Sequence, residues 1–450
     1  MLSRRLASTL TSLPVRTHGN ARRLCTAGSE SVLIAAPSQM RVVDLHRPKA
    51  LNALNSEMVS TLLPLVQDWQ QVDGDVKLIV FRGAGDRAFC AGGDIRFLRE
   101  CAMSGTAAGR AGAASFFREE YSLNHAIGTS RVPVVSILDG IVMGGGVGLS
   151  VHGHVRVASE STTFAMPETG IGFFPDVGGT YFLPRLRGSL GMYLGLTGAR
   201  LRGRDVLTAG VATHFVPASR IEALEAILLE LAAKTHGEHC TIELYPSTAP
   251  LNSLPGSCHG PDTAVASHYH NANLAVPGKR WTLESNQDFV DPDVLFQSIA
   301  SLDLLEPPAA SSEGDPAALT DEALSEIDVA FSKDGVDAII DAVKEYAAAQ
   351  PGESRHWSIA AAKELSRASP TSLVVTHEAL RRGAHRCGSL AECLQMEFRI
   401  AQRFLKHPDF VSGVGAVLSK GAEPASWAAP PSASELEEWF ETGEADDLVL

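Results

Sequence analysis

The sequence predicts an α/β fold for its first half and a helical domain for its second. Apolar runs of strand length alternate with stretches of helical spacing up to about residue 235. A segment rich in Pro, Gly, Ser and His follows, and helical spacing returns after Thr320. These observations divide the chain into a leader (1–29), a core (30–235), an irregular insertion or linker (236–318), a helical C-terminal domain (319–427) and an acidic tail (428–450).

The core begins with short apolar runs at residues 32–35, 41–45 and 76–81, which predict three strands. Between the last two runs, apolar residues recur at spacings of four, three and four: Met58, Leu62, Leu65 and Trp69. We expect this stretch to form an amphipathic helix that begins near the N-cap candidate Asn55.

A turn-rich stretch, residues 82–94, follows the third strand. Gly83, Gly85 and Ala88 imitate the glycine pattern of a dinucleotide-binding loop. Residues 89–93 then add a second turn-like cluster where such a loop would continue into a helix. The stretch therefore argues against a nicotinamide site.

The next predicted helix, residues 113–127, carries an acid on its apolar face. Phe116, Leu123 and Ile127 share one stripe, and Glu120 falls on the same stripe. Burying a carboxylate there is costly unless it is paired or functional. Glu120 is therefore a candidate site residue, although a carboxylate at the edge of the stripe that reaches solvent explains the pattern equally well.

Three consecutive glycines, Gly144 to Gly146, follow a buried strand predicted at residues 133–138. Glycines let backbone N–H groups come close to a ligand, because no Cβ stands in the way. A helix predicted from about residue 146 to 152 would add unpaired N–H groups and the positive end of its dipole. Both features suit a developing oxyanion.

Two acids, Glu168 and Asp176, lie further along in a Pro- and Gly-rich stretch. This stretch cannot form one regular helix, so the two side chains can converge from different sides. They can equally be two acids on a surface loop. The leading interpretation is a site in which backbone donors face carboxylates.

Helical spacing closes the core at residues 221–231. In the C-terminal domain, Ser389 and Glu392 form a predicted capping box ahead of an apolar stripe. The stripe comprises Leu390, Leu394, Phe398, Ala401 and Leu405.

Length, charge and hydropathy limit the class of function. A chain of 450 residues with 45% hydrophobic content can bury a sizeable core. The net charge of −14 argues against a broad polyanion-binding surface, so nucleic acid is not the expected partner. No apolar run reaches the roughly 18 to 20 residues that span a bilayer, because Asp139 and the glycines interrupt the best candidate, residues 132–151. No membrane partner is expected.

The seven cysteines are scattered and never form a Cys-x-x-Cys pair, which argues against a disulfide framework and favours a reducing compartment. The first 29 residues carry arginines with many Ser and Thr, and the first acid is Glu30. This composition predicts a mitochondrial transit peptide, with a disordered tail as the alternative.

Two other chemistries have weaker support. The run Gly148-Leu149-Ser150-Val151-His152 approaches the Gly-x-Ser-x-Gly motif of serine hydrolases, but the final Gly is missing. His and Cys residues also gather in the irregular segment, at spacings that match no zinc module: His236, His239, Cys240, Cys258, His259, His268 and His270. We therefore predict neither a Ser nucleophile nor a metal.

Residues from about 32 to 215 closely resemble the crotonase (enoyl-CoA hydratase/isomerase) superfamily of acyl-CoA enzymes. The resemblance rests on three motifs in order: His46-Arg47-Pro48-Lys49-Ala50-Leu51-Asn52-Ala53-Leu54, Ala88-Phe89-Cys90-Ala91-Gly92-Gly93-Asp94 and the glycine triplet. It implies a crotonase-like ββα spiral core, which the helical C-terminal domain follows.

Further motifs are similar to the 3-hydroxyisobutyryl-CoA hydrolase branch of this superfamily. They are Phe116-Phe117-Arg118-Glu119-Glu120-Tyr121, Met166-Pro167-Glu168-Thr169, Phe174-Pro175-Asp176-Val177-Gly178-Gly179, Ser369-Pro370-Thr371-Ser372-Leu373 and Met396-Glu397-Phe398-Arg399. This resemblance implies a thioesterase of the mitochondrial matrix that acts in valine catabolism. Its substrate would be 3-hydroxyisobutyryl-CoA or a close β-hydroxyacyl-CoA. It would need no metal and no cofactor, since CoA is part of the substrate.

Carried over position by position, the resemblance places the oxyanion hole at the backbone N–H groups of Ala91 and Gly145. Glu120, Glu168 and Asp176 become the substrate-facing acids. Glu168 is then the nucleophile or general base, and Asp176 orients the substrate hydroxyl and the water.

The contacts to CoA depart from the family pattern. Lys49 is a candidate CoA contact. Near the C-terminus the family tends to have Glu-Gly-Val-Arg-Ala and then Asp-Lys-Asp, where this chain has Ser412-Gly413-Val414-Gly415-Ala416 and then Ser419-Lys420-Gly421-Ala422. We expect the lost charges, the Arg above all, to weaken or relocate contacts to the CoA end.

Two alternatives remain open. A hydratase of the superfamily usually has a second catalytic Glu where this chain has Gly148, and without it the addition of water to an alkene lacks an acid–base partner. Members of the branch also resemble a structural component of the small subunit of some mitochondrial ribosomes. The long insertion and the altered C-terminal motif leave room for that role, whereas Glu120, Glu168 and Asp176 favour an enzyme.

Overall fold

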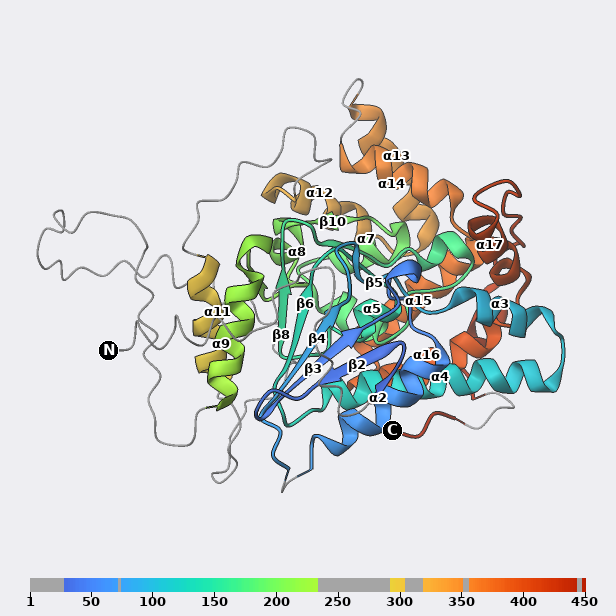
Figure 1. The fold of residues 1–450 in the computed structure, drawn as a ribbon. Coiled ribbons are helices and arrows are strands. Elements are labelled where there is room, and N and C mark those ends of the chain that lie inside the picture. The colour runs from blue at the N-terminus through green and yellow to red at the C-terminus, as the bar shows by residue number, and fades with distance from the viewer. Residues whose placement is uncertain (1–27, 72–73, 234–291, 304–318, 351–355, 443–446) are drawn as a thin grey trace, which may run out of the picture.

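A computed structural model describes residues 28–71, 74–233, 292–303, 319–350, 356–442 and 447–450 (Figure 1). Almost all of the predicted transit peptide lies outside the described residues. The same holds for the His and Cys cluster between residues 236 and 270 and for most of the predicted insertion.

Two sheets form the centre of the core. The larger has seven strands in the order β1-β2-β3-β4-β6-β8-β11, antiparallel from β1 to β3 and parallel from β3 onwards. Its strands are β1 (Gly28–Ser29), β2 (Val32–Ala35), β3 (Met40–Leu45), β4 (Leu78–Gly83), β6 (Val134–Leu138), β8 (Val155–Ala158) and β11 (His214–Phe215). The three strands predicted at the start of the chain are therefore confirmed as β2, β3 and β4, with small shifts at their ends.

The smaller sheet has four strands in the order β10-β9-β7-β5, with β5, β7 and β9 parallel and β10 antiparallel to β9. Its strands are β5 (Ala88–Cys90), β7 (Ile141–Met143), β9 (Thr163–Ala165) and β10 (Leu201–Arg202). Because β5 and β7 are neighbours, the ends of both strands lie close together. The glycine triplet follows β7 at this edge.

Helices alternate with the strands through the core (Figure 1). They are η2 (Pro48–Ala50), α2 (Ser56–Asp68), α3 (Ile95–Met103), α4 (Ala107–Gly128), α5 (Gly145–Gly148), η3 (Glu168–Ile171), α6 (Gly179–Phe182), η4 (Leu183–Arg185), α7 (Leu190–Thr197), α8 (Arg204–Thr208), η5 (Ala218–Arg220) and α9 (Ile221–Ala233). The predicted helix from residue 146 to 152 was too long, because α5 ends at Gly148. The predicted N-cap Asn55 is confirmed, since its side chain accepts a hydrogen bond from the Met58 N–H at 3.0 Å.

After the core, the described chain is almost entirely helical. The helices are α11 (Pro292–Asp303), α12 (Asp321–Phe331), α13 (Val336–Ala349), α14 (Trp357–Arg367), α15 (Pro370–His385), α16 (Leu390–Phe404), α17 (Pro408–Leu418) and α18 (Ala433–Glu438). At α16 half of the predicted capping box is present. The Ser389 hydroxyl accepts from the Glu392 N–H at 3.2 Å, whereas the Glu392 carboxylate accepts from the Gly388 N–H at 2.5 Å.

The two faces of the seven-stranded sheet pack against different layers. On one face, side chains of β3, β4, β6 and β8 pack on α9 and α11, which lie side by side in Figure 1. On the other face, the sheet shares one continuous hydrophobic cluster with α2, α4 and the C-terminal helices α12 to α17. The C-terminal helices therefore complete the core that holds the site. The α/β fold with a helical C-terminal region is confirmed, while the predicted domain boundaries remain predictions.

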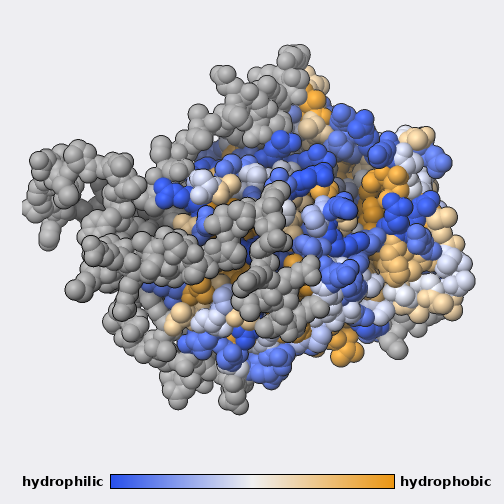
Figure 2. All heavy atoms as spheres, in the orientation of Figure 1, coloured by the Kyte–Doolittle hydropathy of each residue, from blue (hydrophilic) through white to orange (hydrophobic). Residues whose placement is uncertain are grey.

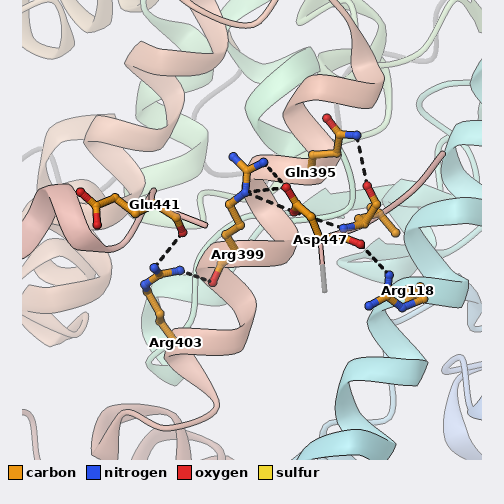
Figure 3. A network of polar contacts seen from close by, with 7 residues as sticks. Arg118, Gln395, Arg399, Arg403, Glu441 and Asp447 are labelled. Carbon is orange, nitrogen blue, oxygen red and sulfur yellow. Dashed lines mark hydrogen bonds and ion pairs between the residues drawn. The ribbon is translucent and has the colours of Figure 1, made fainter. Parts of the chain in front are cut away.

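The last described residues are held against α16 and α4 (Figure 3). Arg399 forms an ion pair with Asp447, and Arg118 of α4 donates to the Asp447 carbonyl at 2.9 Å. Gln395 donates to the Leu448 carbonyl at 3.1 Å. These contacts bridge the core and the C-terminal helices, and they bury the Leu448 side chain.

The face drawn in Figure 2 is largely hydrophilic among the residues that it colours, with apolar atoms gathered on the side where Figure 1 places α3 and α17. Met103 of α3 and Val417 of α17 are two of the large apolar side chains that are exposed. Among the described helices, none combines the length and the hydropathy that crossing a membrane would require.

Candidate active site

The glycine triplet forms a tight turn between β7 and α5. Gly144 has a φ of 46°, in the left-handed region, and α5 begins at the next residue. The N–H of Gly145 lies in the first turn of the helix, where no intrahelical acceptor is available. A Cβ on Gly145 would lie 2.5 Å from Glu120 Oε1 and 3.1 Å from Leu54 Cδ1. Glycine is therefore needed here for a close approach of backbone and carboxylate.

Glu120 reaches this turn from α4. Its side chain is 2% exposed, so the alternative of a solvent-reaching carboxylate is wrong. Its Oε1 has no hydrogen-bond partner among the described residues. Phe116 and Leu123 flank it on the buried face of α4, as the stripe predicted. A buried oxygen without a partner is costly, so Glu120 has the character of a ligand-binding group.

Glu168 approaches the same turn from the other side. It is the first residue of η3 and is 6% exposed. A Cβ on Gly144 would lie 3.0 Å from Glu168 Oε1, and Glu168 Oε2 has no hydrogen-bond partner among the described residues. The turn at Gly144 and Gly145 is thus flanked by two carboxylates, each with an unpartnered oxygen.

Asp176 completes the group of acids. It is 6% exposed, and its Oδ2 accepts a hydrogen bond from the Tyr121 hydroxyl at 2.7 Å. Tyr121 follows Glu120 on α4, so a single helix supplies one acid and the donor that holds another. The alternative that Glu168 and Asp176 are surface acids is wrong, because both are buried.

Burial raises the pKa values of all three carboxyl groups, and Asp176 adds to the shift of the other two. Burial, and then the charge of Asp176, raises the pKa values of Glu120 and Glu168 well above their usual range. Burial raises the pKa of Asp176 to about 7, although the hydrogen bond from Tyr121 opposes the shift. A carboxyl group with a pKa of about 7, such as that of Asp176, can exchange protons with a substrate near neutral pH.

The second predicted oxyanion donor, Ala91, is already engaged. Its N–H donates to the Leu51 carbonyl at 3.0 Å. Ala91 could therefore serve a substrate carbonyl only by sharing or giving up this bond. Gly93, two residues later, places its N atom 3.3 Å from the position of a Cβ on Gly145. The role of Ala91 stays a prediction.

Gly148 has no space for a side chain. A Cβ there would lie 2.7 Å from Val177 Cβ and 2.8 Å from Asn124 Nδ2. The space into which a hydratase would extend its second Glu is filled by two buried side chains, Asn124 and Val177. This packing argues against the hydratase alternative.

The predicted CoA contact Lys49 is exposed on η2, two residues before Leu51. The first half of the altered C-terminal motif lies in α17, where Gly415 stands at the position of the family's Arg, and the second half follows the end of this helix. Arg99 of α3 fills this space, with Nη2 3.0 Å from the position of a Cβ on Gly415 and Nε donating to the Val411 carbonyl at 3.0 Å. A cation therefore occupies this place from a different element.

The competing motifs form no site. The Ser150 hydroxyl donates to the Gly146 carbonyl at 2.9 Å, and His152 Nε2 pairs with the Val177 carbonyl at 2.7 Å, so the two side chains do not face each other. Residues 88–90 form strand β5 in place of the helix that a dinucleotide fingerprint requires. Among the described residues, no three His, Cys, Asp or Glu side chains are grouped to hold a metal ion.

Sequence reasoning assigned no role to four buried side chains near Asp176. These are Tyr121, Asn124, His152 and Glu397, all of which contact the acid, its neighbours in the chain or Gly148. Tyr121 and Glu397 stand inside quoted motifs, but nothing in their spacing indicated what they contact. Asn124 lies one turn after Glu120, and both polar atoms of its amide are buried without a hydrogen-bond partner among the described residues.

Comparisons with known proteins identify the family and the fold of this chain. The model of the family described as enoyl-CoA hydratase/isomerase matches residues 40–276 and 291–441. Among solved structures, a carnitinyl-CoA dehydratase from Mycobacterium thermoresistibile superposes with a TM-score of 0.69 at 31% identity, over 94% of this chain and 99% of that one. An enoyl-CoA hydratase from Rhodobacter sphaeroides 2.4.1 gives a TM-score of 0.67 at 27% identity, over 93% and 100%.

Curated relatives carry one name, "3-hydroxyisobutyryl-CoA hydrolase, mitochondrial". The protein from Xenopus tropicalis is 41% identical over 86% of this chain and 81% of its own length, and the human protein is 38% identical over 89% and 85%. The word mitochondrial in this name agrees with the mitochondrial localisation predicted from residues 1–29. The chain is thus a member of the enoyl-CoA hydratase/isomerase family and, within it, belongs to the 3-hydroxyisobutyryl-CoA hydrolases.

Proposed function

We propose that this protein hydrolyses 3-hydroxyisobutyryl-CoA, or a close β-hydroxyacyl-CoA, to the free acid and CoA in the mitochondrial matrix, as a step of valine catabolism. The observation that carries the proposal is a group of three buried acids: Glu120 and Glu168 approach the turn at Gly144 and Gly145, and the charge of Asp176 acts on both. Two of these acids, Glu120 and Glu168, keep an unpartnered oxygen. The names of the relatives support the choice of substrate.

In the proposed mechanism the thioester carbonyl oxygen accepts a hydrogen bond from the N–H of Gly145. Ala91 is the second donor if its N–H gives up the hydrogen bond to the Leu51 carbonyl. Charge develops on this oxygen as the carbonyl carbon is attacked, and loss of one such donor typically costs about 3 to 4 kcal/mol of transition-state stabilisation. The Gly145 N–H belongs to the backbone at the start of α5 and needs no reorganisation, whereas the Ala91 N–H must first give up the Leu51 carbonyl.

Glu168 supplies the attack in one of two ways. As a general base it takes a proton from water while the water oxygen bonds to the carbonyl carbon. As a nucleophile it forms an anhydride that water then hydrolyses. In both routes the C–S bond breaks and the CoA sulfur leaves as a thiol after gaining a proton. Asp176 orients the substrate hydroxyl and the water, and Glu120 contacts the acyl part.

The reaction as proposed uses only protein groups and water, so we propose that no metal or cofactor takes part. Thiol release should then be unchanged by a chelator. Lys49 is the proposed contact to the CoA phosphates. We find no observation that favours the ribosomal role, and comigration of the protein with the small ribosomal subunit would be needed to revive it.

The test is thiol release from 3-hydroxyisobutyryl-, 3-hydroxypropionyl- and crotonyl-CoA, measured side by side. We expect turnover of the hydroxyacyl thioesters and none of crotonyl-CoA. Glu168→Gln should lower kcat by about 100- to 10,000-fold, because it removes the base or nucleophile. Glu119→Gln on α4 is the matched control, since the Glu119 carboxylate accepts a hydrogen bond from the Ser115 hydroxyl at the surface. Undiminished turnover in Glu168→Gln would sink the mechanism.

A further inference from the structure

The turn after Asp176 has an unusual backbone. Val177 has a φ of 54° and Gly178 a φ of 84°, so two consecutive residues lie in the left-handed region. A β-branched residue such as Val is strained there, and the conformation persists only where its surroundings enforce it. The turn therefore depends on contacts that hold it.

Glu397 provides the largest set of these contacts. It lies on α16, more than 200 residues away in sequence, and is completely buried. Its Oε2 accepts from the Gly178 N–H at 2.7 Å, and its Oε1 accepts from the Thr180 N–H at 2.8 Å and the Thr180 hydroxyl at 2.6 Å. All three partners donate, so these hydrogen bonds favour the ionised carboxylate, against the burial that raises the pKa of Glu397 to about 8.

His152 holds the same turn from the core side. Burial lowers the pKa of His152 to about 4, so the ring is neutral near neutral pH. A neutral ring that pairs with a carbonyl must donate, and its Nε2–H therefore donates to the Val177 carbonyl at 2.7 Å. The His152 ring also lies so close to Gly178 that a Cβ there would overlap it.

The contacts of Glu397 and His152 leave the Asp176 side chain little freedom. Its backbone carbonyl accepts from the Gly179 N–H at 2.8 Å, its carboxylate accepts from Tyr121, and the next residues are fixed by His152 and Glu397. The ring of Phe398, which follows Glu397 on α16, contacts the Tyr121 ring with a centroid separation of 6.5 Å. Helix α16 thus supports both the turn at residues 177–180 and Tyr121, which donates the hydrogen bond to Asp176.

We propose that Glu397 is a positioning residue for Asp176: its carboxylate holds the turn at residues 177–180 and so fixes the Asp176 side chain against the substrate. The inference rests on the proposed function, in which Asp176 orients the hydroxyl of the acyl group. It gives the C-terminal helices a part in substrate selection, although they supply none of the three acids.

The test compares 3-hydroxyisobutyryl-CoA with isobutyryl-CoA, which lacks the hydroxyl. Glu397→Gln keeps the volume of the side chain but turns an amide NH2 towards N–H donors. We expect it to lower kcat/KM for the hydroxyacyl thioester about tenfold or more, with a much smaller effect on isobutyryl-CoA. The preference for the hydroxyl should therefore fall, as it should in Asp176→Asn.

A purely structural role would lower both activities together. Asp44→Asn is the control, since Asp44 is paired with Arg82 on the sheet and its loss should change stability while leaving the preference intact. If Glu397→Gln does not fold, Thr180→Val and Thr180→Ser replace it. Thr180→Val removes one hydrogen-bond donor to Glu397 and should lower the preference for the hydroxyl. Thr180→Ser keeps the hydroxyl and should retain the preference.

Each result is decisive. No thiol release by the wild-type protein would overturn the proposed function itself, and an unchanged preference in Asp176→Asn would overturn the role of Asp176 on which the inference rests. If Asp176→Asn loses the preference while Glu397→Gln or, in its place, Thr180→Val keeps it, the positioning role of Glu397 is wrong.

Discussion

At the scale of single residues, the site is a group of acids whose protonation depends on a few neighbours. Asp176 is the clearest case, because burial and a single phenol hydroxyl act on it in opposite directions. Burial favours the neutral acid, and the hydroxyl of Tyr121 favours the carboxylate. Removing the burial or the hydrogen bond should shift the pKa of Asp176 and, with it, the pH at which the enzyme becomes active.

Tyr121→Phe removes the hydrogen bond to Asp176 and leaves the ring in place. Because the lost donor stabilised the carboxylate, the pKa of Asp176 should rise. The rising acid limb of the kcat–pH profile should therefore move to higher pH. A pH series of thiol release measures this shift, and a limb that stays in place or moves to lower pH would contradict the assignment.

Asp176 should also cost stability at alkaline pH. Its pKa is raised in the folded protein from an ordinary 3.8 to about 7, so the folded state binds more protons between these values. Stability then falls as pH rises through this window. Since each pKa unit corresponds to about 1.4 kcal/mol, Asp176→Asn should stabilise the fold by a few kcal/mol at pH 8. Near pH 3 the gain should vanish.

Thermal unfolding of both proteins at the two pH values checks this expectation. A gain of equal size at pH 3 and pH 8 would show that the stabilisation does not come from the charge of Asp176.

At the scale of elements, the site is made where side chains of α4 and η3 approach the glycines at the start of α5. Gly148 shows how close this packing is, because Asn124 of α4 and Val177 both lie within 3 Å of the position of its missing Cβ. Since Val177 adjoins Asp176, we expect a change in α5 to displace the turn at residues 177–180.

Gly148→Ala should therefore reduce both stability and activity. The added methyl group must displace Val177 or Asn124, at a cost of about 1 to 3 kcal/mol, and a displaced turn should lower kcat about tenfold or more. Chemical denaturation and thiol release measure the two effects. Gly112→Ala on α4 is the matched control, because its Cβ would meet Cys101 Sγ at an ordinary 3.7 Å. Full activity in Gly148→Ala would mean that the turn tolerates the shift.

At the scale of the whole molecule, the C-terminal helices are part of the same core as the sheets. Phe404 of α16 stacks on Phe174, two residues before Asp176, with ring centroids 5.6 Å apart. Trp439 covers Phe404 from the other side at 4.6 Å. The site is therefore supported by residues from distant parts of the chain.

Phe404→Ala should destabilise the protein by about 3 to 5 kcal/mol, because it empties a fully buried position. Denaturant unfolding measures this loss, for which Met103→Ala, an exposed apolar residue of α3, is the control. A loss below about 1 kcal/mol would indicate that the helices dock independently of this contact.

The sequence was sufficient for four of the strands, for several helices and for the candidate acids, but it did not indicate the strands of the smaller sheet. Strand-length apolar runs located β2, β3, β4 and β6, because local hydrophobic spacing follows the local period of the backbone. Glu120 was found as an acid on an apolar stripe, and only the structure decided that it is buried. Resemblance to a family then selected Glu168 and Asp176, whose burial spacing alone left undecided.

Only the tertiary structure decided what surrounds those acids. Ala91 and Leu51 are bonded, Arg99 fills the space at Gly415, and Glu397 holds the turn beside Asp176 from the C-terminal helices. Each of these contacts joins residues far apart in sequence, and no local pattern encodes such a pairing. The sequence by itself determined which residues are the candidates for the chemistry, whereas the fold decided which partners hold them, because hydrogen bonds and packing depend on distances in space.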